Sequence, residues 1–296
     1  MTGGAKRAPV ASIALRAAAG LLVGVVAAGA GLLAAQAPSV ASQPQPPGGR
    51  GRGGRGGPPP TGRAGAPVDL TGIWVSVVTE DWQWRMRTPA KGDVTSVPLN
   101  PAGIAAANAW DPSMDGRCEA YGVGGLMRLP LRLRISWQDD YTLKIETDAG
   151  QQTRLLHFQP PAAPGAAPAA VNSGPRTLQG YSAAEWQQSG GALDAFGPGV
   201  APERAGGAPA RRWGSLKVVT TNMLPGWLRR NGVPYSDRTT VTEYFARFSN
   251  REAGDWFVVT TIVEDPVYLQ DRFITSSNFK KEPDDSKWDP KPCRTS

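Results

Sequence analysis

The sequence predicts an all-β, mainly antiparallel fold of about 8–10 strands with one or two short helices. From Val68 onward, short apolar or alternating runs are separated by turn residues, which is the spacing of β-strands. Helical segments do not alternate with these strands, so a parallel α/β sheet is not expected. No repeat of solenoid or propeller length is present. We therefore expect one β-barrel-like domain over residues 68–296.

The residues before this domain read as an export signal and a linker. Positive residues precede a charge-free apolar run over 17–35, which is typical of a secretory signal peptide. We expect the signal to cover 1–41, with cleavage after Ala41. An uncleaved membrane anchor is the alternative, because the apolar run approaches the length that spans a bilayer. Residues 42–67 are rich in Gly, Pro and Arg, so a disordered linker is expected.

Charge argues against a nucleic-acid partner. The chain has 32 Lys and Arg against 25 Asp and Glu, but seven of the cations precede the first acidic residue, Asp69. The remainder carries 25 of each sign, so the predicted domain is neutral and lacks the composition of a basic binding surface. The Arg-Gly-Gly segment lacks the aromatic residues that usually accompany Arg in RNA-binding tails. Membrane contact is expected only through an uncleaved N-terminal segment.

The first elements of the domain are two strands and a helix. A strand is expected over 70–79, and a second over 82–86 because Trp and Met alternate there with polar residues. Asn100 and Pro101 supply an N-cap and a first-turn proline for a short helix over 102–110.

A meander of three strands follows. Its strands are expected over 131–137, 142–147 and 152–158, joined by short turns. One face of this meander is apolar and the other is charged. The favoured interpretation is a solvated outer face with cross-strand ion pairs. The alternative places the charges inside a ligand-holding barrel, where Arg134, Glu146 and Arg154 fix a polar group of the ligand.

The second half of the domain resumes the strand pattern between two loops. The segments 159–176 and 187–212 are rich in Ala, Pro and Gly and are expected to be long flexible surface loops. A strong turn is expected at Asn231-Gly232-Val233-Pro234. The expected strands are 178–186, 214–221, 239–248, 255–264 and 271–279.

Cys118 and Cys293 are the two cysteines of a chain with an expected export signal. A disulfide is the simplest account of such an even pair. The competing interpretation, a nucleophilic Cys118, lacks a histidine nearby in sequence. One histidine and two cysteines rule out most His-rich or Cys-rich metal sites, because a closed zinc site needs four such ligands, and neither a metal nor a cofactor is expected.

His157 is the single histidine, and a Ser-His-Asp or Cys-His arrangement would have to use it. The Gly-x-Ser-x-Gly motif of serine hydrolases is absent, and a lone histidine in a strand more often packs locally. Glu146 and His157 are the candidate acid and base if the protein is an enzyme.

Gly72-Ile73-Trp74, which follows Asp69, resembles the Gly-x-Trp element on the first strand of lipocalins and related calycin barrels. This resemblance implies a lipocalin-like barrel in which the Trp packs across the closed end against an Arg from a late strand, and Arg272 is the counterpart it suggests. Residues 69–293 are also similar to a group of uncharacterised secreted bacterial proteins. That similarity implies a periplasmic or secreted location and no particular chemistry.

Three functions are compatible with this fold. The favoured one is a non-catalytic barrel that binds a small apolar or amphipathic molecule, since such barrels enclose cavities and many aromatic residues are available to line one. The alternatives are a barrel enzyme of isomerase or hydratase type acting on a lipid-like substrate, and a structural envelope protein whose tryptophans fill the core. The available aromatic residues are Trp82, Trp84, Tyr121, Trp137, Tyr244 and Trp256. The expected ligand contacts are Trp82, Trp84, Tyr121, Arg134, Arg154 and Tyr244.

Overall fold

A computed structural model describes residues 61–160, 174–188 and 214–295, all within one compact unit. The expected signal peptide, most of the linker and most of both long loops lie outside the described residues. Within the described ranges, no helix is long and apolar enough to cross a membrane.

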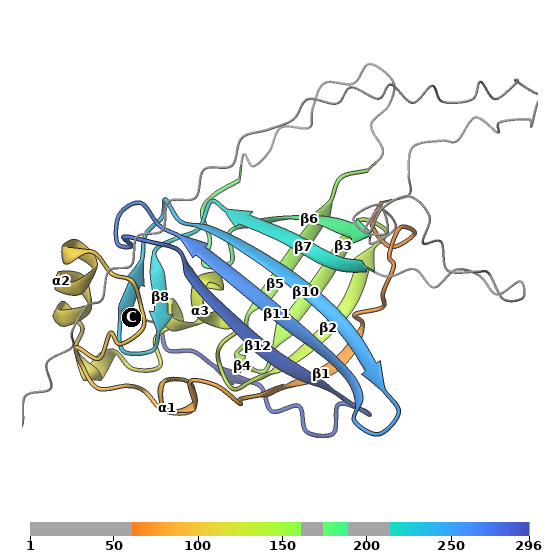
Figure 1. Cartoon of the computed structure of the whole chain (residues 1–296), viewed down its shortest axis with the longest axis horizontal. Coiled ribbons are helices and arrows are strands. Elements are labelled where there is room, and N and C mark those ends of the chain that lie inside the picture. Colours follow the sequence, from red (N-terminus) through yellow and green to blue (C-terminus); the bar gives the residue numbers. More distant parts are fainter. Residues whose placement is uncertain (1–60, 161–173, 189–213, 296) are drawn as a thin grey trace, which may run out of the picture. The chain divides into compact units, whose positions relative to one another are not determined.

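The described strands include a closed barrel in the order β1-β12-β11-β10-β7-β6-β5-β3-β2 (Figure 1). Neighbouring strands run antiparallel except β5 and β6. These two run parallel, and both start at the same end of the barrel. This architecture confirms the all-β prediction and fits a lipocalin-like barrel. The bounds are β1 Gly72–Val77, β2 Arg132–Asp139, β3 Thr142–Thr147, β5 Thr153–Phe158, β6 Tyr181–Gln188, β7 Gly214–Thr221, β10 Thr240–Asn250, β11 Gly254–Glu264 and β12 Phe273–Glu282.

One end of the barrel is covered by short elements, which gather at the left of Figure 1. They come from residues 80–130, between the end of β1 and the start of β2, and from residues 222–239, between the end of β7 and the start of β10. We call these two segments the plug. Its elements are α1 Trp82–Arg85, α2 Pro101–Ala109, η1 Pro112–Met114, η2 Cys118–Tyr121, α3 Val123–Leu126, β8 Gly226–Arg229 and β9 Val233–Tyr235.

The opposite end of the lumen is filled by aromatic side chains. Trp74, Phe257 and Phe279 are fully buried, and the ring of Phe257 lies 4.7 Å from that of Trp74 and 4.8 Å from that of Phe279. The indole Nε1 of Trp74 donates to the carbonyl of Leu70, at 2.9 Å. This layer closes the core at the end where β1 begins.

Residues 61–67, which the sequence assigns to the linker, contact the same end of the barrel. The carbonyl of Gly62 accepts a hydrogen bond from Trp186 Nε1, at 2.7 Å. The amide of Arg63 donates to the carbonyl of Asp140 in the turn between β2 and β3, at 2.8 Å. The folded unit therefore begins before the predicted boundary at Val68.

The predicted helix is confirmed and the predicted strand over 82–86 is wrong. Asn100 caps α2, its side chain accepting from the amide of Gly103 at 2.9 Å. In α1, by contrast, Trp82 is 58% exposed and Arg85 is buried. The alternation of large apolar residues therefore does not mark a buried strand face, because the side chain that this segment buries is a cation.

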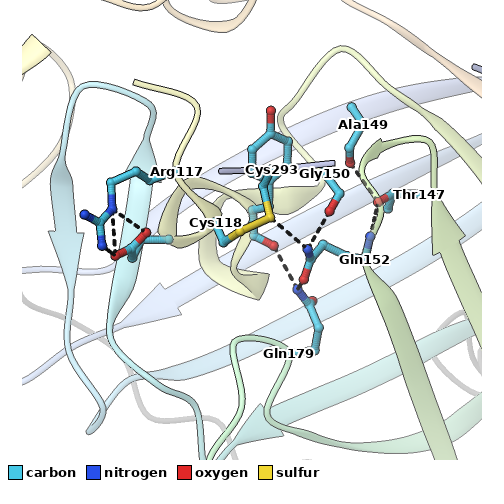
Figure 2. Close-up of a disulfide and its surroundings, with 10 residues drawn as sticks. Arg117, Cys118, Thr147, Ala149, Gly150, Gln152, Gln179 and Cys293 are labelled. Atoms are coloured by element: carbon cyan, nitrogen blue, oxygen red, sulfur yellow. Dashed lines mark hydrogen bonds and ion pairs between the residues drawn. A yellow bond between two sulfur atoms is a disulfide. The ribbon is translucent and has the colours of Figure 1, made fainter. Parts of the chain in front are cut away.

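The predicted disulfide joins Cys118 of η2 to Cys293 (Figure 2). Cys293 follows the short strand β13, Lys291–Pro292, which pairs in parallel with β4, Ala149–Gly150. The amide of Cys118 also donates to the carbonyl of Arg294, at 3.1 Å. Backbone pairing and the covalent bond together attach the C-terminal segment to the plug and to the turn before β5.

Candidate functional site

Trp74 occupies the position that the Gly-x-Trp resemblance implies, but Arg272 is not its cationic partner. The register pairs Trp74 of β1 with Lys281 of β12, whose Nζ lies 5.5 Å from the centre of the indole ring. Arg272 precedes β12, is 63% exposed in its side chain and pairs with Glu264 at 2.7 Å. A late-strand cation does meet the tryptophan, but it comes from the other end of β12.

The plug side of the lumen holds a buried polar cluster, the lumen belt, made of Arg154, Ser182, Thr220 and Glu243. These residues point inward from β5, β6, β7 and β10, and each is at most 1% exposed. Arg154 Nε donates to Ser182 Oγ at 3.2 Å, and Arg154 Nη2 donates to Thr220 Oγ1 at 3.0 Å. Arg154 Nη2 also forms an ion pair with Glu243 Oε2.

Further polar side chains continue this belt around the wall. Thr261 of β11 is the register partner of Glu243 and is buried. Ser277 of β12 is also buried, and its Oγ accepts from Arg85 Nη2, which reaches up from the plug, at 3.4 Å. Polar groups therefore line the lumen between the aromatic layer and the plug.

Two atoms of the belt have no hydrogen-bond partner among the described residues: Arg154 Nη1 and Glu243 Oε1. Both are buried, and buried polar groups in folded proteins are nearly always paired with protein, water or ligand. The pair as a whole is neutral, so the belt offers one unpartnered donor nitrogen and one unpartnered acceptor oxygen to a group beside it.

Of the predicted charged residues, Arg134 and Glu146 lie opposite each other on β2 and β3, on the outer face, whereas Arg154 points into the lumen. Arg134 lies on the outer face, over the ring of Trp288 at 4.4 Å, and Glu146 pairs with Lys144 at 3.2 Å. These residues follow the favoured interpretation of the meander, in which the charged face is solvated. Arg154 is on the inner face, as the alternative interpretation required.

His157 also lies apart from the belt. Its ring stacks on Tyr181 at 5.0 Å, from neighbouring strands β5 and β6. Burial lowers the pKa of His157, although the nearby carboxylate of Asp139 opposes this effect. Glu146 is the register partner of Thr153 and His157 that of Thr142, at opposite ends of β3, so this candidate acid and base are not brought together.

The predicted aromatic residues do not line one cavity. Trp82 is largely exposed, and Tyr121, at the end of η2, lies beside Gly150. Tyr244 alternates along β10 with the inward Glu243, so it lies on the outer face.

The remaining aromatic residues are equally dispersed. Trp256 is on the outer face of β11, where Lys280 lies 5.5 Å from its ring. Trp137 packs on Phe158 at 5.5 Å, at the end opposite the plug. Trp84 is in the plug, where its Nε1 donates to Asp93 at 2.7 Å.

Glu243 is the charged belt residue that the sequence analysis missed; it also missed Ser182 and Thr220. A usable signal was present, since Val241, Glu243 and Phe245 occupy one face of an alternating strand and two of the three are apolar. An acid in that position must be buried with a partner, which identifies it as an unusual core residue.

No protein-family model, no curated protein and no solved structure matches this sequence. The function must therefore be argued from the belt and its surroundings.

Proposed function

We propose that this protein is an exported binding protein whose barrel holds a small amphipathic molecule, with the polar group of that molecule at the lumen belt. The observation that carries the proposal is the buried pair Arg154–Glu243, which leaves Nη1 and Oε1 without partners in the described part of the chain. A hydroxyl or carboxamide group supplies one acceptor and one donor at once. Such a group satisfies both atoms.

The balanced charges of the lumen belt favour an uncharged head group. Arg154 and Glu243 already balance each other, so a bound carboxylate would face the charge of Glu243 and an ammonium group that of Arg154. The next inward residues toward the aromatic layer are apolar: Leu156 on β5, Val218 on β7 and Phe245 on β10. They supply the contacts for the apolar part of the molecule.

The compartment is part of the same proposal. The Cys118–Cys293 disulfide fits an oxidising environment, and the leader-like first 41 residues favour export. We propose that the protein is located in the periplasm or outside the cell.

Titration calorimetry of the full chain with four probes of equal chain length tests this function. The probes are 1-octanol, octanamide, octanoate and octylammonium. We expect the two neutral probes to bind and the two charged probes to bind at least tenfold more weakly. Equal binding of all four, or binding of none, would overturn the proposal, and the second result would favour a structural envelope protein.

A double substitution separates the head-group site from the fold. Arg154→Met with Glu243→Leu removes both charges and keeps similar volume, a change that buried ion pairs often tolerate. This variant should fold and lose the preference for the neutral probes. The matched control is Lys144→Met with Glu146→Leu, which removes an ion pair from the outer face and should leave binding unchanged.

A further inference from the structure

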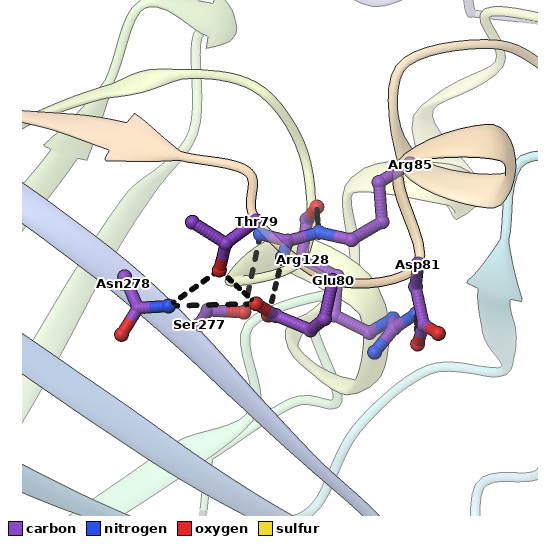
Figure 3. A network of polar contacts seen from close by, with 7 residues as sticks. All are labelled: Thr79, Glu80, Asp81, Arg85, Arg128, Ser277 and Asn278. Atoms are coloured by element: carbon purple, nitrogen blue, oxygen red, sulfur yellow. Dashed lines mark hydrogen bonds and ion pairs between the residues drawn. The ribbon is translucent and has the colours of Figure 1, made fainter.

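Three arginines are buried in the plug: Arg85, Arg128 and Arg229. Figure 3 shows how two of them are partnered. Arg85 pairs with Glu80 at 2.7 Å and donates from Nε to the carbonyl of Arg128, at 2.8 Å. Arg128 Nη2 pairs with Asp81 at 2.9 Å. Arg85 is therefore anchored through its guanidinium, while Arg128 is anchored through one nitrogen.

Among the described residues, the third arginine, Arg229, has no hydrogen-bond acceptor. All three guanidinium nitrogens of Arg229 are buried without a partner within the described ranges, and so is Nη1 of Arg128. Burial, followed by the positive charge of Arg128, lowers the pKa of Arg229 to about 10, so it remains protonated at neutral pH. Four buried donor nitrogens of two charged guanidinium groups thus meet no acceptor among the described residues.

The two nearby carboxylates do not supply the missing hydrogen-bond acceptors of Arg229. Asp81 and Asp93 are close enough to oppose the lowering of the pKa of Arg229. Within the described ranges neither accepts a hydrogen bond from it: Asp81 pairs with Arg128, and Asp93 accepts from Trp84 Nε1 at 2.7 Å. A buried guanidinium without an acceptor is costly, and a bound anion removes that cost.

An aromatic ring separates Arg229 from a hollow at the surface. The guanidinium carbon of Arg229 lies 4.9 Å from the centre of the Trp84 ring. Trp84 in turn lines a hollow of about 240 Å³, together with Gln83, Arg87, Thr88, Pro89, Ala90 and Asp93. Trp84 therefore contacts both the unpartnered guanidinium and the hollow.

We propose that the plug binds an oxyanion, the carboxylate or phosphate group of a small solute, between Arg128 and Arg229, and that it enters past Trp84. A guanidinium presents its donors as a planar fork that matches two oxygens of either group. The site shares no residue with the lumen belt, and it selects a charged group where the belt selects a neutral one.

Arginine Nε resonances of the full chain, followed by NMR, give a direct test. The probes are inorganic phosphate and sodium acetate, with potassium chloride at matched ionic strength. We expect a saturable shift of the Arg229 resonance with phosphate or acetate, and the one that saturates at lower concentration identifies the preferred oxyanion. A shift that potassium chloride reproduces would overturn the proposal.

Arg229→Met supplies a second readout, which a purely structural arginine would not give. We expect this variant to melt no lower than the wild type in the absence of oxyanions, because it loses an unpartnered buried charge. Phosphate or acetate should raise the melting temperature of the wild type and leave that of Arg229→Met unchanged. A variant that melts well below the wild type without the probes, or that responds to them equally, would overturn the proposal.

Two controls define the site. Arg134→Met removes another guanidinium stacked on a tryptophan, at 4.4 Å from Trp288, but on the outer face of the barrel, and should leave the response to both probes unchanged. The double belt variant, Arg154→Met with Glu243→Leu, should also retain this response. Its loss in either control would show that the effect is not confined to the plug.

Discussion

Arg154 on β5 and Glu243 on β10 form an ion pair across the two strands that separate them in the barrel, β6 and β7. Both side chains are almost fully buried, and hydroxyls from the two intervening strands, Ser182 and Thr220, accept hydrogen bonds from Arg154. One side chain thus contacts three other strands of the wall. The Arg154–Glu243 pair, which we propose as the ligand site, therefore also connects strands of the barrel to one another.

Breaking this pair from one side should be far more damaging than removing it entirely. Arg154→Met leaves Glu243 buried without a cation, and we expect it to lower the free energy of unfolding by about 3–5 kcal/mol. Arg154→Met with Glu243→Leu should recover most of that loss. Urea denaturation of the single and double variants measures the coupling energy, and additive losses would show that the two side chains stabilise the fold independently.

Loss of the disulfide should destabilise the folded unit without changing its architecture. Cys118 and Cys293 are 175 residues apart in sequence, so the bond restricts a large loop of the unfolded chain. We expect Cys293→Ser to lower the free energy of unfolding by about 2–5 kcal/mol. A reducing agent should lower the stability of the wild type similarly and leave the Ser variant unchanged, whereas an equal response would show that the agent acts elsewhere.

The barrel was largely predictable because its long strands alternate. The bounds of β7 were predicted correctly, and β10, β11 and β12 lie within a few residues of the expected ranges. The hairpin of β8 and β9 was missed, although the turn within it was predicted. Every residue of both strands is buried, so no alternation marks them.

The polar sites were less predictable, because their partners are distant in sequence. Alternation places Arg154 on one face of its strand but does not say which face is inward. Its partner Glu243 is 89 residues away, and Arg85 meets Ser277 across 192 residues. Only the closed topology brings such residues together, and a strand pattern alone carries no information about the barrel's closure.

Two glycines with similar backbone angles should respond differently to alanine. Gly150 and Gly254 have φ of +77° and +81°, so alanine is strained at both by about 1–2 kcal/mol. At Gly150 the added methyl carbon would also lie 2.2 Å from a ring carbon of Tyr121, whereas at Gly254 it meets nothing within 4 Å. We expect Gly150→Ala to cost about 1–3 kcal/mol more than Gly254→Ala in thermal or urea unfolding. Equal losses would show that Tyr121 moves aside freely.

The cation beside the first-strand tryptophan can be identified by a matched pair of variants. Lys281→Met removes the charge over the ring of Trp74 and should lower the free energy of unfolding by about 0.5–1 kcal/mol. Arg272→Met removes an exposed side chain that pairs with Glu264 and should change this free energy by less than about 0.5 kcal/mol. A larger loss of unfolding free energy for Arg272→Met than for Lys281→Met would identify Arg272 as the partner of Trp74, as the lipocalin resemblance suggested.

Stability should depend on pH through His157. Burial beside Tyr181 lowers the pKa of this imidazole from its ordinary value of 6.5, and the carboxylate of Asp139 offsets only part of that effect. The folded state therefore binds the proton less readily than the unfolded state. The contribution of His157 to the free energy of unfolding is complete above the pKa of the imidazole in the unfolded chain. It is lost as the pH falls through the pKa of His157 in the folded state.

His157→Gln isolates this contribution, because it removes the titrating group and leaves every carboxylate in place. The difference in free energy of unfolding between the wild type and His157→Gln should shift against the wild type as the pH falls from about 7.5 to about 5. Urea denaturation at several pH values measures it, and NMR titration of the imidazole gives the folded pKa directly. A difference that is constant over this range, or an imidazole pKa above that of an unfolded peptide, would contradict the prediction and show that Asp139 outweighs burial.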